Sequence, residues 1–219
     1  MIINKNSLIT KIYLISPPII EKNIFYQQLT KAVKTNCLSM FQLRLKNYQS
    51  IEVEEIAKQS KKICHDYGVE FVLNDYVEIV DSVSPDCVHV GLDNFNDFDL
   101  LLKLKMKLAN LKISASCYGS KEFAELAIKN NFDYLSFGPF FESKTKPTKR
   151  LPPDLLMIKN LANNFNFKSI AIGGIDDLNC KTLVENGINY LAVISYVFSN
   201  RDGVDKAIIK LAKAIKSYQ

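Results

Sequence analysis

Short runs of β-branched and aromatic residues alternate along this chain with longer segments whose apolar residues recur at helical spacing. The runs predict eight strands, at residues 11–16, 38–44, 70–74, 87–90, 112–116, 134–138, 169–172 and 190–195. The longer segments predict eight helices, at residues 20–35, 50–67, 77–82, 97–109, 120–130, 153–164, 178–186 and 203–217. We therefore expect a series of strand–helix units.

Two of the predicted helices begin with local start signals. Ser50 is expected to cap the second helix, because Glu52 and Glu54 follow in a first turn whose free N–H groups favour acids. The Pro-Pro-Asp sequence at 152–154 opens the sixth helix, with prolines where a missing N–H does least harm.

The apolar character of the strands and their number predict how the strands are arranged in a sheet. Most strands are nearly continuous apolar runs, which is typical of parallel strands covered on both faces. Such units form either a (β/α)8 barrel or an open doubly wound sheet. Eight units favour the barrel, and the Pro-Pro-Ile-Ile sequence at 17–20 lacks the glycines of a dinucleotide-binding sheet. We expect an α/β fold, a TIM barrel, with residues 1–219 in one domain.

Composition narrows the class of protein. The 219 residues are 47% hydrophobic and 23% charged, as in ordinary globular proteins. The longest apolar run, at 190–198, is far shorter than the about 18 residues of a membrane-spanning helix, and residues 1–6 lack a signal-peptide pattern. The five cysteines are widely spaced and contain no C-x-x-C pair, which favours reduced thiols. We expect a cytoplasmic protein that does not bind membranes.

The net charge of +5 allows anionic ligands. Most lysines lie on predicted helices, where a solvated face explains them, and no basic stripe with interleaved aromatic residues suggests nucleic-acid binding. The expected partners are small molecules rather than nucleic acids. The sequence allows a homo-oligomer and leaves the oligomeric state open.

Polar residues and glycines gather where the predicted strands end. In a parallel barrel, the carboxyl ends of the strands and the loops after them assemble the chemistry. The residues at these ends include Gln42, Arg44, Lys46, Asn74, Asp75, His89, Asn94, Ser116, Ser143, Thr145, Lys146, Gly173, Gly174, Ile194 and Ser195. Their shared position predicts one site.

One subset suits a phosphate group. Gly173 and Gly174 follow the seventh strand, and Ile194 and Ser195 end the eighth, at the two loops where barrels most often bind phosphate through backbone N–H groups. A tight turn into the next helix also explains two adjacent glycines.

A second subset suits a pyrophosphate. Arg44, Lys46 and Lys146 are cations, and Asn74 and Asp75 offer the oxygen ligands that Mg2+ prefers. Singly, the cations also fit a solvated strand edge, and the Asn-Asp pair fits a helix cap. Convergence on one face of the barrel favours the site.

Two reactive residue types receive structural explanations. His89 is expected to be a core or strand-end histidine, because no acid or nucleophile stands at a recognisable spacing. Cys117 is expected to be a structural thiol, because no histidine lies near it in sequence.

The combined motifs resemble the thiamine phosphate synthase (thiamine-phosphate pyrophosphorylase) family, which also includes thiazole tautomerases. The matching segments are Gln-Leu-Arg-x-Lys at 42–46, Asn-Asp at 74–75, Val-His-Val-Gly at 88–91, the loop with Ser143, Thr145 and Lys146, Ala-Ile-Gly-Gly-Ile at 171–175 and Ala-Val-Ile-Ser at 192–195. The resemblance covers about residues 12–198.

The resemblance implies a transferase. It implies condensation of 4-amino-2-methyl-5-(diphosphooxymethyl)pyrimidine with 4-methyl-5-(2-phosphooxyethyl)thiazole, or its carboxylated form, through a dissociative, Mg2+-assisted substitution. It assigns catalysis to Arg44, Lys46, Lys146 and Ser116. It assigns substrate binding to these residues and to Gln42, Asn74, Ser143, Thr145, Gly174, Ile194 and Ser195, and Mg2+ binding to Asp75 and Asn94.

The chain departs from the family pattern at the second metal ligand. Asn94 aligns with the usual aspartate, and Asp93 precedes it. Two alternatives therefore stay open beside the synthase. One is a thiazole tautomerase, in which Tyr118 would stand where that enzyme carries a histidine, and the other is a non-catalytic relative that binds a phosphate ligand.

Overall fold

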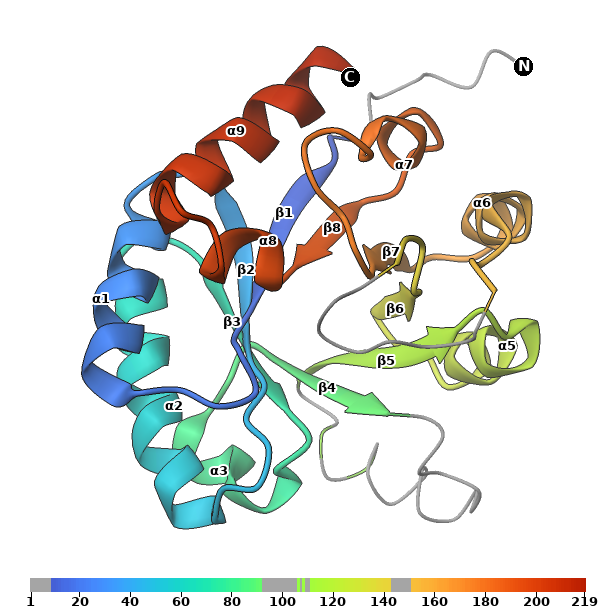
Figure 1. Cartoon of the computed structure of the whole chain (residues 1–219). Coiled ribbons are helices and arrows are strands. Elements are labelled where there is room, and N and C mark those ends of the chain that lie inside the picture. The colour runs from blue at the N-terminus through green and yellow to red at the C-terminus, as the bar shows by residue number, and fades with distance from the viewer. Residues whose placement is uncertain (1–8, 92–105, 107, 109–110, 143–150) are drawn as a thin grey trace.

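The computed structural model describes residues 9–91, 106, 108, 111–142 and 151–219. Within these residues, eight parallel strands hydrogen-bond in chain order and close into a barrel (Figure 1). The strands are β1 Lys11–Ile15, β2 Leu38–Leu43, β3 Glu70–Asn74, β4 Cys87–Gly91, β5 Lys112–Tyr118, β6 Tyr134–Phe137, β7 Lys168–Ile172 and β8 Tyr190–Val193. The prediction of a (β/α)8 barrel is confirmed.

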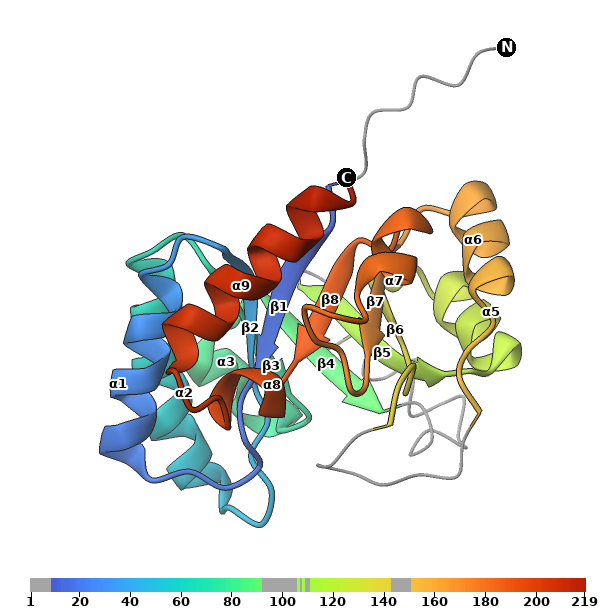
Figure 2. The same ribbon diagram turned by 45° about the horizontal axis from the view of Figure 1, so that its top comes forward.

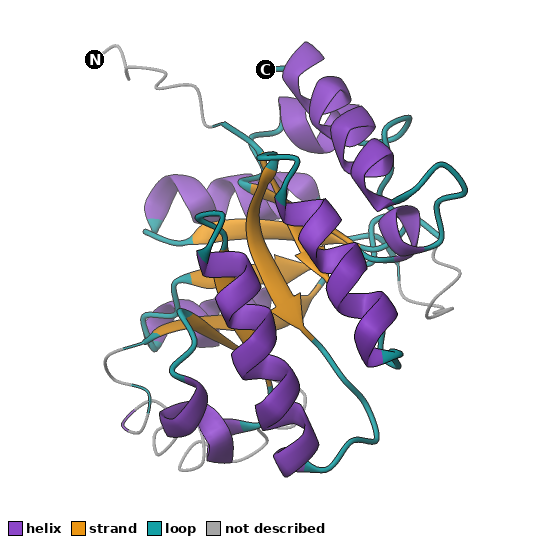
Figure 3. Ribbon diagram, turned by 90° about the vertical axis from the view of Figure 1, so that its left-hand side faces the viewer, coloured by secondary structure: helices purple, strands orange, loops and turns teal. Residues whose placement is uncertain are grey.

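Helices surround the strands on the outside of the barrel (Figure 3). The described helical elements are α1 Lys22–Val33, α2 Ser50–His65, the 3-10 turn η1 Val77–Ile79, α3 Val80–Val83, α5 Lys121–Lys129, α6 Leu155–Asn164, α7 Lys181–Glu185, α8 Ser195–Phe198 and α9 Val204–Ser217. The helix predicted at 97–109 lies outside the described residues, apart from 106 and 108.

Three predicted details of these elements are wrong. Gln49, not Ser50, is the N-cap of α2: its backbone N–H donates to Glu52, while the Ser50 hydroxyl donates to Glu78. Asp154 caps α6 by accepting from the N–H of Leu156, so the helix begins at Leu155. Ser195 starts the short helix α8 rather than ending the eighth strand. Figure 2 shows α8 beside α9.

Alternate residues of most strands enter two separate cores. Residues such as Leu14, Phe41 and Leu73 face outward and pack with the helices in the larger core. Residues such as Met40, Val72 and Ile170 fill the inside of the barrel. The period of two, which is inherent to a strand, thus gives most strands two apolar faces, whereas β5 turns the polar Ser114 and Ser116 toward His89.

The amino ends of the strands are closed by a charged and aromatic cluster. Lys112 pairs with Glu70 (Nζ to Oε1, 2.9 Å), and the Tyr134 hydroxyl donates to the other carboxylate oxygen of Glu70 (3.3 Å). The Tyr190 ring meets those of Tyr134 and Tyr13 edge-on, with centroids 5.8 and 6.4 Å apart. We call these five residues the basal cluster. They close this end, so a ligand site belongs at the carboxyl ends.

In the described part of the chain, no helix is long and apolar enough to span a bilayer.

Candidate active site

Gln42 lies inside the barrel near the end of β2. Its side chain is buried, and its Nε2 donates to the Tyr13 hydroxyl at 2.8 Å. This bond connects Gln42 to the basal cluster and fixes which way its amide faces. Gln42 is thereby held rigidly at the floor of the site.

Arg44 and Lys46 follow β2, and their backbones are tied to the segment after β1. The N–H of Arg44 donates to Ser16 Oγ at 2.8 Å, and the N–H of Lys46 donates to the Pro18 carbonyl at 2.9 Å. Arg44 is half-buried and Lys46 is exposed. Two cations therefore extend from a braced backbone at the rim of the barrel.

Asn74 and Asp75 end β3 next to these cations. The buried Asn74 amide donates to Asp75 Oδ2 at 2.7 Å, and the N–H of Asp75 donates to the His89 carbonyl at 2.9 Å. Asp75 adopts φ +63°, a left-handed conformation that Asp and Asn tolerate better than most residues. The Asx pair is thus turned into the site by the backbone.

Opposing interactions act on the pKa of the Asp75 carboxyl group. Partial burial raises its pKa above the usual value, while the Asn74 amide, the Arg44 charge and the N–H of Gly91 act in the opposite direction. Among the described residues, no three His, Cys, Asp or Glu side chains converge as a complete metal site. Asp75 fits Mg2+, which is commonly held by one or two carboxylates together with phosphate oxygens and water.

His89 lies inside the barrel on β4, between two serines of β5. Its Nδ1 is 2.8 Å from Ser114 Oγ and its Nε2 is 2.8 Å from Ser116 Oγ. Burial, with a smaller contribution from the Arg44 charge, lowers the pKa of His89 to about 4, so the ring is neutral at pH 7. The prediction of a buried strand histidine is confirmed.

Ser114 was not singled out as a site residue by motif reasoning. Its spacing of two from Ser116 on a strand places both on the same face, and this signal is readable in the sequence. Cys117 on the same strand faces outward and is buried in the outer core, where burial raises the pKa of its thiol to about 12. This thiol is not an available nucleophile at neutral pH.

Gly173 and Gly174 follow β7, which pairs with β8, so their loop is adjacent to Ile194 and Ser195. Both glycines have positive φ, +102° and +63°. A Cβ on Gly174 would lie 2.3 Å from the Glu142 carbonyl oxygen, so the backbone of the loop after β6 leaves no room for a side chain at Gly174. The backbone alone therefore requires glycine at both positions, and the assignment of phosphate to Gly174, Ile194 and Ser195 stays a prediction.

Four predicted site residues lie outside the described residues: Asn94, Ser143, Thr145 and Lys146. Asp93 and Lys144 lie there too. Among those described, Arg44, Lys46, Asn74 and Asp75 meet at one end of the barrel. His89 pairs with Asn74 in the β3–β4 register, and its ring hydrogen-bonds Ser116. The roles of all these residues stay predictions.

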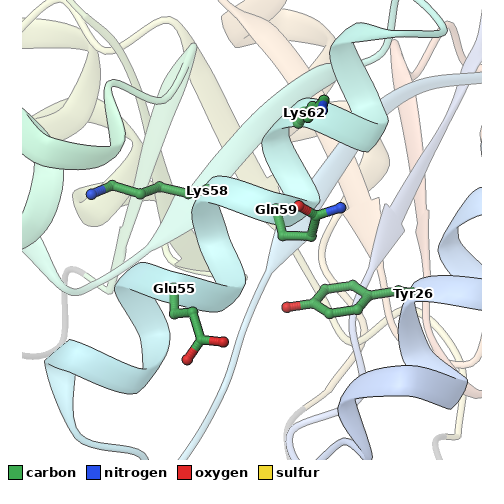
Figure 4. Close-up of a pocket in the computed structure, with 5 residues that line it drawn as sticks. All are labelled: Tyr26, Glu55, Lys58, Gln59 and Lys62. Carbon is green, nitrogen blue, oxygen red and sulfur yellow. The ribbon is translucent and has the colours of Figure 1, made fainter.

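A surface depression of about 660 Å³ lies elsewhere, between α1 and α2. Figure 4 shows Tyr26 of α1 pointing toward the α2 residues Glu55, Lys58, Gln59 and Lys62. Glu55 pairs with Lys22, and Lys58 pairs with Glu54. The depression is remote from the strand ends and its charges are partly neutralised locally, so we do not assign it to the site.

Comparisons with known proteins agree with the geometry. The model of the thiamine monophosphate synthase family matches residues 12–197. The chain is 35% identical over 190 residues to the thiamine-phosphate synthase of Pelagibacter ubique, covering 87% of this chain and 89% of that one. It is 32% identical over 193 residues to the thiamine-phosphate synthase of Erythrobacter litoralis, with the same coverage.

A solved structure extends the match to three dimensions. Thiamine phosphate pyrophosphorylase from Pyrococcus furiosus superposes with a TM-score of 0.77 at 27% identity, over 95% of this chain and 96% of that one. Sequence and structural relatives thus match nearly the whole chain. The chain belongs to the thiamine monophosphate synthase family.

Proposed function

We propose that this chain synthesises thiamine phosphate from a pyrimidine methyl diphosphate and a thiazole phosphate, and releases pyrophosphate. The observation that carries the proposal is the meeting of Arg44 and Lys46 with Asn74 and Asp75 at the rim of the barrel. Cations beside a carboxylate–amide pair suit a magnesium diphosphate. An isomerase that handles no diphosphate has no use for this set.

The bond changes explain why such a site suffices. The bond between the pyrimidine methylene carbon and the diphosphate oxygen breaks, and its electron pair leaves with that oxygen. The lone pair of the thiazole nitrogen forms the new C–N bond, giving a thiazolium. No proton is transferred, so the reaction needs no general base. Positioned cations and a dry pocket supply the catalysis.

The described residues divide this work. Arg44 and Lys46 stabilise the negative charge that grows on the leaving diphosphate. Gln42, held by Tyr13, and Ser116, held by His89, orient the pyrimidine diphosphate. Asp75 would hold Mg2+, which neutralises diphosphate charge when bound. Asn94 is the second proposed ligand, Lys146 the third cation, and Ser143, Thr145, Gly174, Ile194 and Ser195 the thiazole phosphate contacts.

We also propose that the protein works in the cytoplasm. All five cysteines are free, and four of them are buried. Free thiols suit a reducing compartment.

The direct test combines purified protein, both substrates and Mg2+. The expected result is equal amounts of thiamine phosphate and pyrophosphate, and neither product when a substrate is omitted or the metal is chelated. Lys46→Ala should reduce the rate by at least ~10-fold. The matched control is Lys58→Ala, another exposed lysine, which should keep the full rate. No product at saturating Mg2+ would refute the proposal.

A further inference from the structure

The His89 ring bridges two serines that lie on the interior face of one strand. His89 pairs with Ser114 in the β4–β5 register, and Ser116 stands two residues further toward the site. Ser114 is fully buried, whereas Ser116 is half-buried at the site. The ring nitrogens are each 2.8 Å from one serine oxygen. The three side chains therefore form a row that leads from the barrel interior into the site.

Counting protons fixes the direction of the hydrogen bonds in this row. A neutral imidazole has one N–H donor and one bare acceptor nitrogen, and each serine has one O–H donor. In the described part of the chain, Ser114 Oγ has hydrogen-bonding contact with His89 alone. If Nδ1 carried the proton, the buried Ser114 hydroxyl would have no acceptor for its own proton. Burying an unpaired donor is unfavourable.

In the arrangement that leaves no buried donor unpaired, the hydrogen bonds run in the opposite direction, from Ser114 toward Ser116. The Ser114 hydroxyl donates to Nδ1, so Nε2 carries the ring proton and donates to Ser116 Oγ. The Ser116 oxygen is then already used as an acceptor, and its own proton is directed away from the ring. Because Ser116 is half-buried at the carboxyl end of β5, that proton is available to a ligand.

We propose that Ser114 and His89 are positioning residues that make Ser116 an obligate hydrogen-bond donor to an acceptor atom of the bound pyrimidine diphosphate. The proposal rests on the proposed function for the identity of the ligand. The acceptor is a diphosphate oxygen or a ring nitrogen, both of which carry lone pairs. In the reversed arrangement, Ser116 would present lone pairs to those lone pairs and repel the substrate.

The tautomer can be measured directly, without any activity. The chain has two histidines, His65 and His89, so long-range 1H–15N spectra of 15N-histidine-labelled protein contain two rings, and His65→Gln identifies them. The expected result is a His89 ring protonated at Nε2 and bare at Nδ1. A ring protonated at Nδ1 would overturn the proposal, whether or not the protein makes thiamine phosphate.

Variants test whether Ser114 sets the direction of the hydrogen bonds through the His89 ring. Ser114→Ala should weaken the Nε2–H preference of His89. The matched control is Ser60→Ala, which removes another buried serine hydroxyl, one with no hydrogen-bond partner among the residues that the structure describes, and should leave the spectrum unchanged.

The same variants give a kinetic test. Ser114→Ala should lower kcat/KM roughly 10-fold, as loss of a residue that orients a ligand-binding group does in other sites. In the Ser116→Ala background, Ser114→Ala should have no further effect. Equal losses in both backgrounds would show that Ser114 acts through packing and would refute the positioning role. An inactive wild type would refute the proposed function instead and leave the tautomer measurement standing.

Discussion

Asp75 depends on its neighbours for both its backbone and its charge. Its N–H bond to the His89 carbonyl holds a left-handed residue in place, and the Asn74 amide occupies one carboxylate oxygen. The N–H of Gly91 also donates to this carboxylate. The two adjacent polar residues were recognisable from the sequence, but their fixed orientation depends on β4, which is contributed from elsewhere in the chain.

Asp75→Asn should raise the Mg2+ concentration needed for half-maximal rate by at least ~10-fold, since it removes a negative ligand. The measurement is the rate of pyrophosphate release across an Mg2+ titration. Asp202→Asn, at an exposed position after α8, serves as the control and should follow the wild type. An unchanged Mg2+ dependence in Asp75→Asn would show that the metal is held elsewhere.

The five thiols should differ sharply in reactivity. Burial raises the pKa of Cys64, Cys87, Cys117 and Cys180, while Cys37 is only partly buried. At pH 8 a thiol-specific disulfide reagent should therefore react quickly with about one thiol in native protein, because only the thiolate attacks. After denaturation, all five thiols should react. Rapid reaction of several thiols in native protein would contradict the packing of the outer core.

At the scale of elements, the loop after β7 is tightly constrained by its neighbours. Gly174 combines positive φ with a backbone oxygen where its Cβ would lie, whereas Gly68 has positive φ (+67°) and open space around it. Substituting both glycines therefore distinguishes the cost of a left-handed residue from the cost of a steric clash, which a substitution of Gly174 alone would combine.

Gly68→Ala should destabilise the protein by about 1 kcal/mol, the cost of a left-handed non-glycine residue. Gly174→Ala should cost at least about 1 kcal/mol more, because the segment that contains Glu142 must shift. Urea unfolding monitored by circular dichroism measures both. Equal losses would mean that the contact with Glu142 is not maintained in solution.

The strands were predictable from the sequence because each is a compact apolar run, and their ends shift by few residues. Helix starts were less predictable. Ser50 matched the usual cap residue, yet its hydroxyl binds Glu78, a partner supplied by the tertiary fold. The short helix α8 could not be anticipated, since four residues carry too little periodicity. The site segments were found through their place at strand ends, whereas the contacts of Ser114 with His89 and of Tyr13 with Gln42 were found only in the structure.

At the scale of the whole molecule, the two ends of the barrel differ in the residues that they carry and in what those residues do. The basal cluster closes the amino ends, while the carboxyl ends carry the polar residues of the site. Ends that differ in this way are typical of parallel barrels.

Substitutions at the two ends should therefore affect different quantities. Glu70→Gln should change the unfolding free energy by no more than about 1 kcal/mol, because its pair with Lys112 is partly solvated, and should leave kcat/KM unchanged. Arg44→Ala should leave stability near that of the wild type and reduce the rate by at least ~10-fold. Thermal unfolding and steady-state kinetics of both variants measure this split. A large rate loss in Glu70→Gln would show that the ends are not separate in function.

The bond between Gln42 and Tyr13 has a consequence for how the protein responds to its ligand. It completes a column of contacts along the barrel axis, from Lys112 and Glu70 through the tyrosine rings to the floor of the site. Gln42 is therefore oriented before the substrate arrives, so binding loses less conformational entropy than it would with a free side chain at this position.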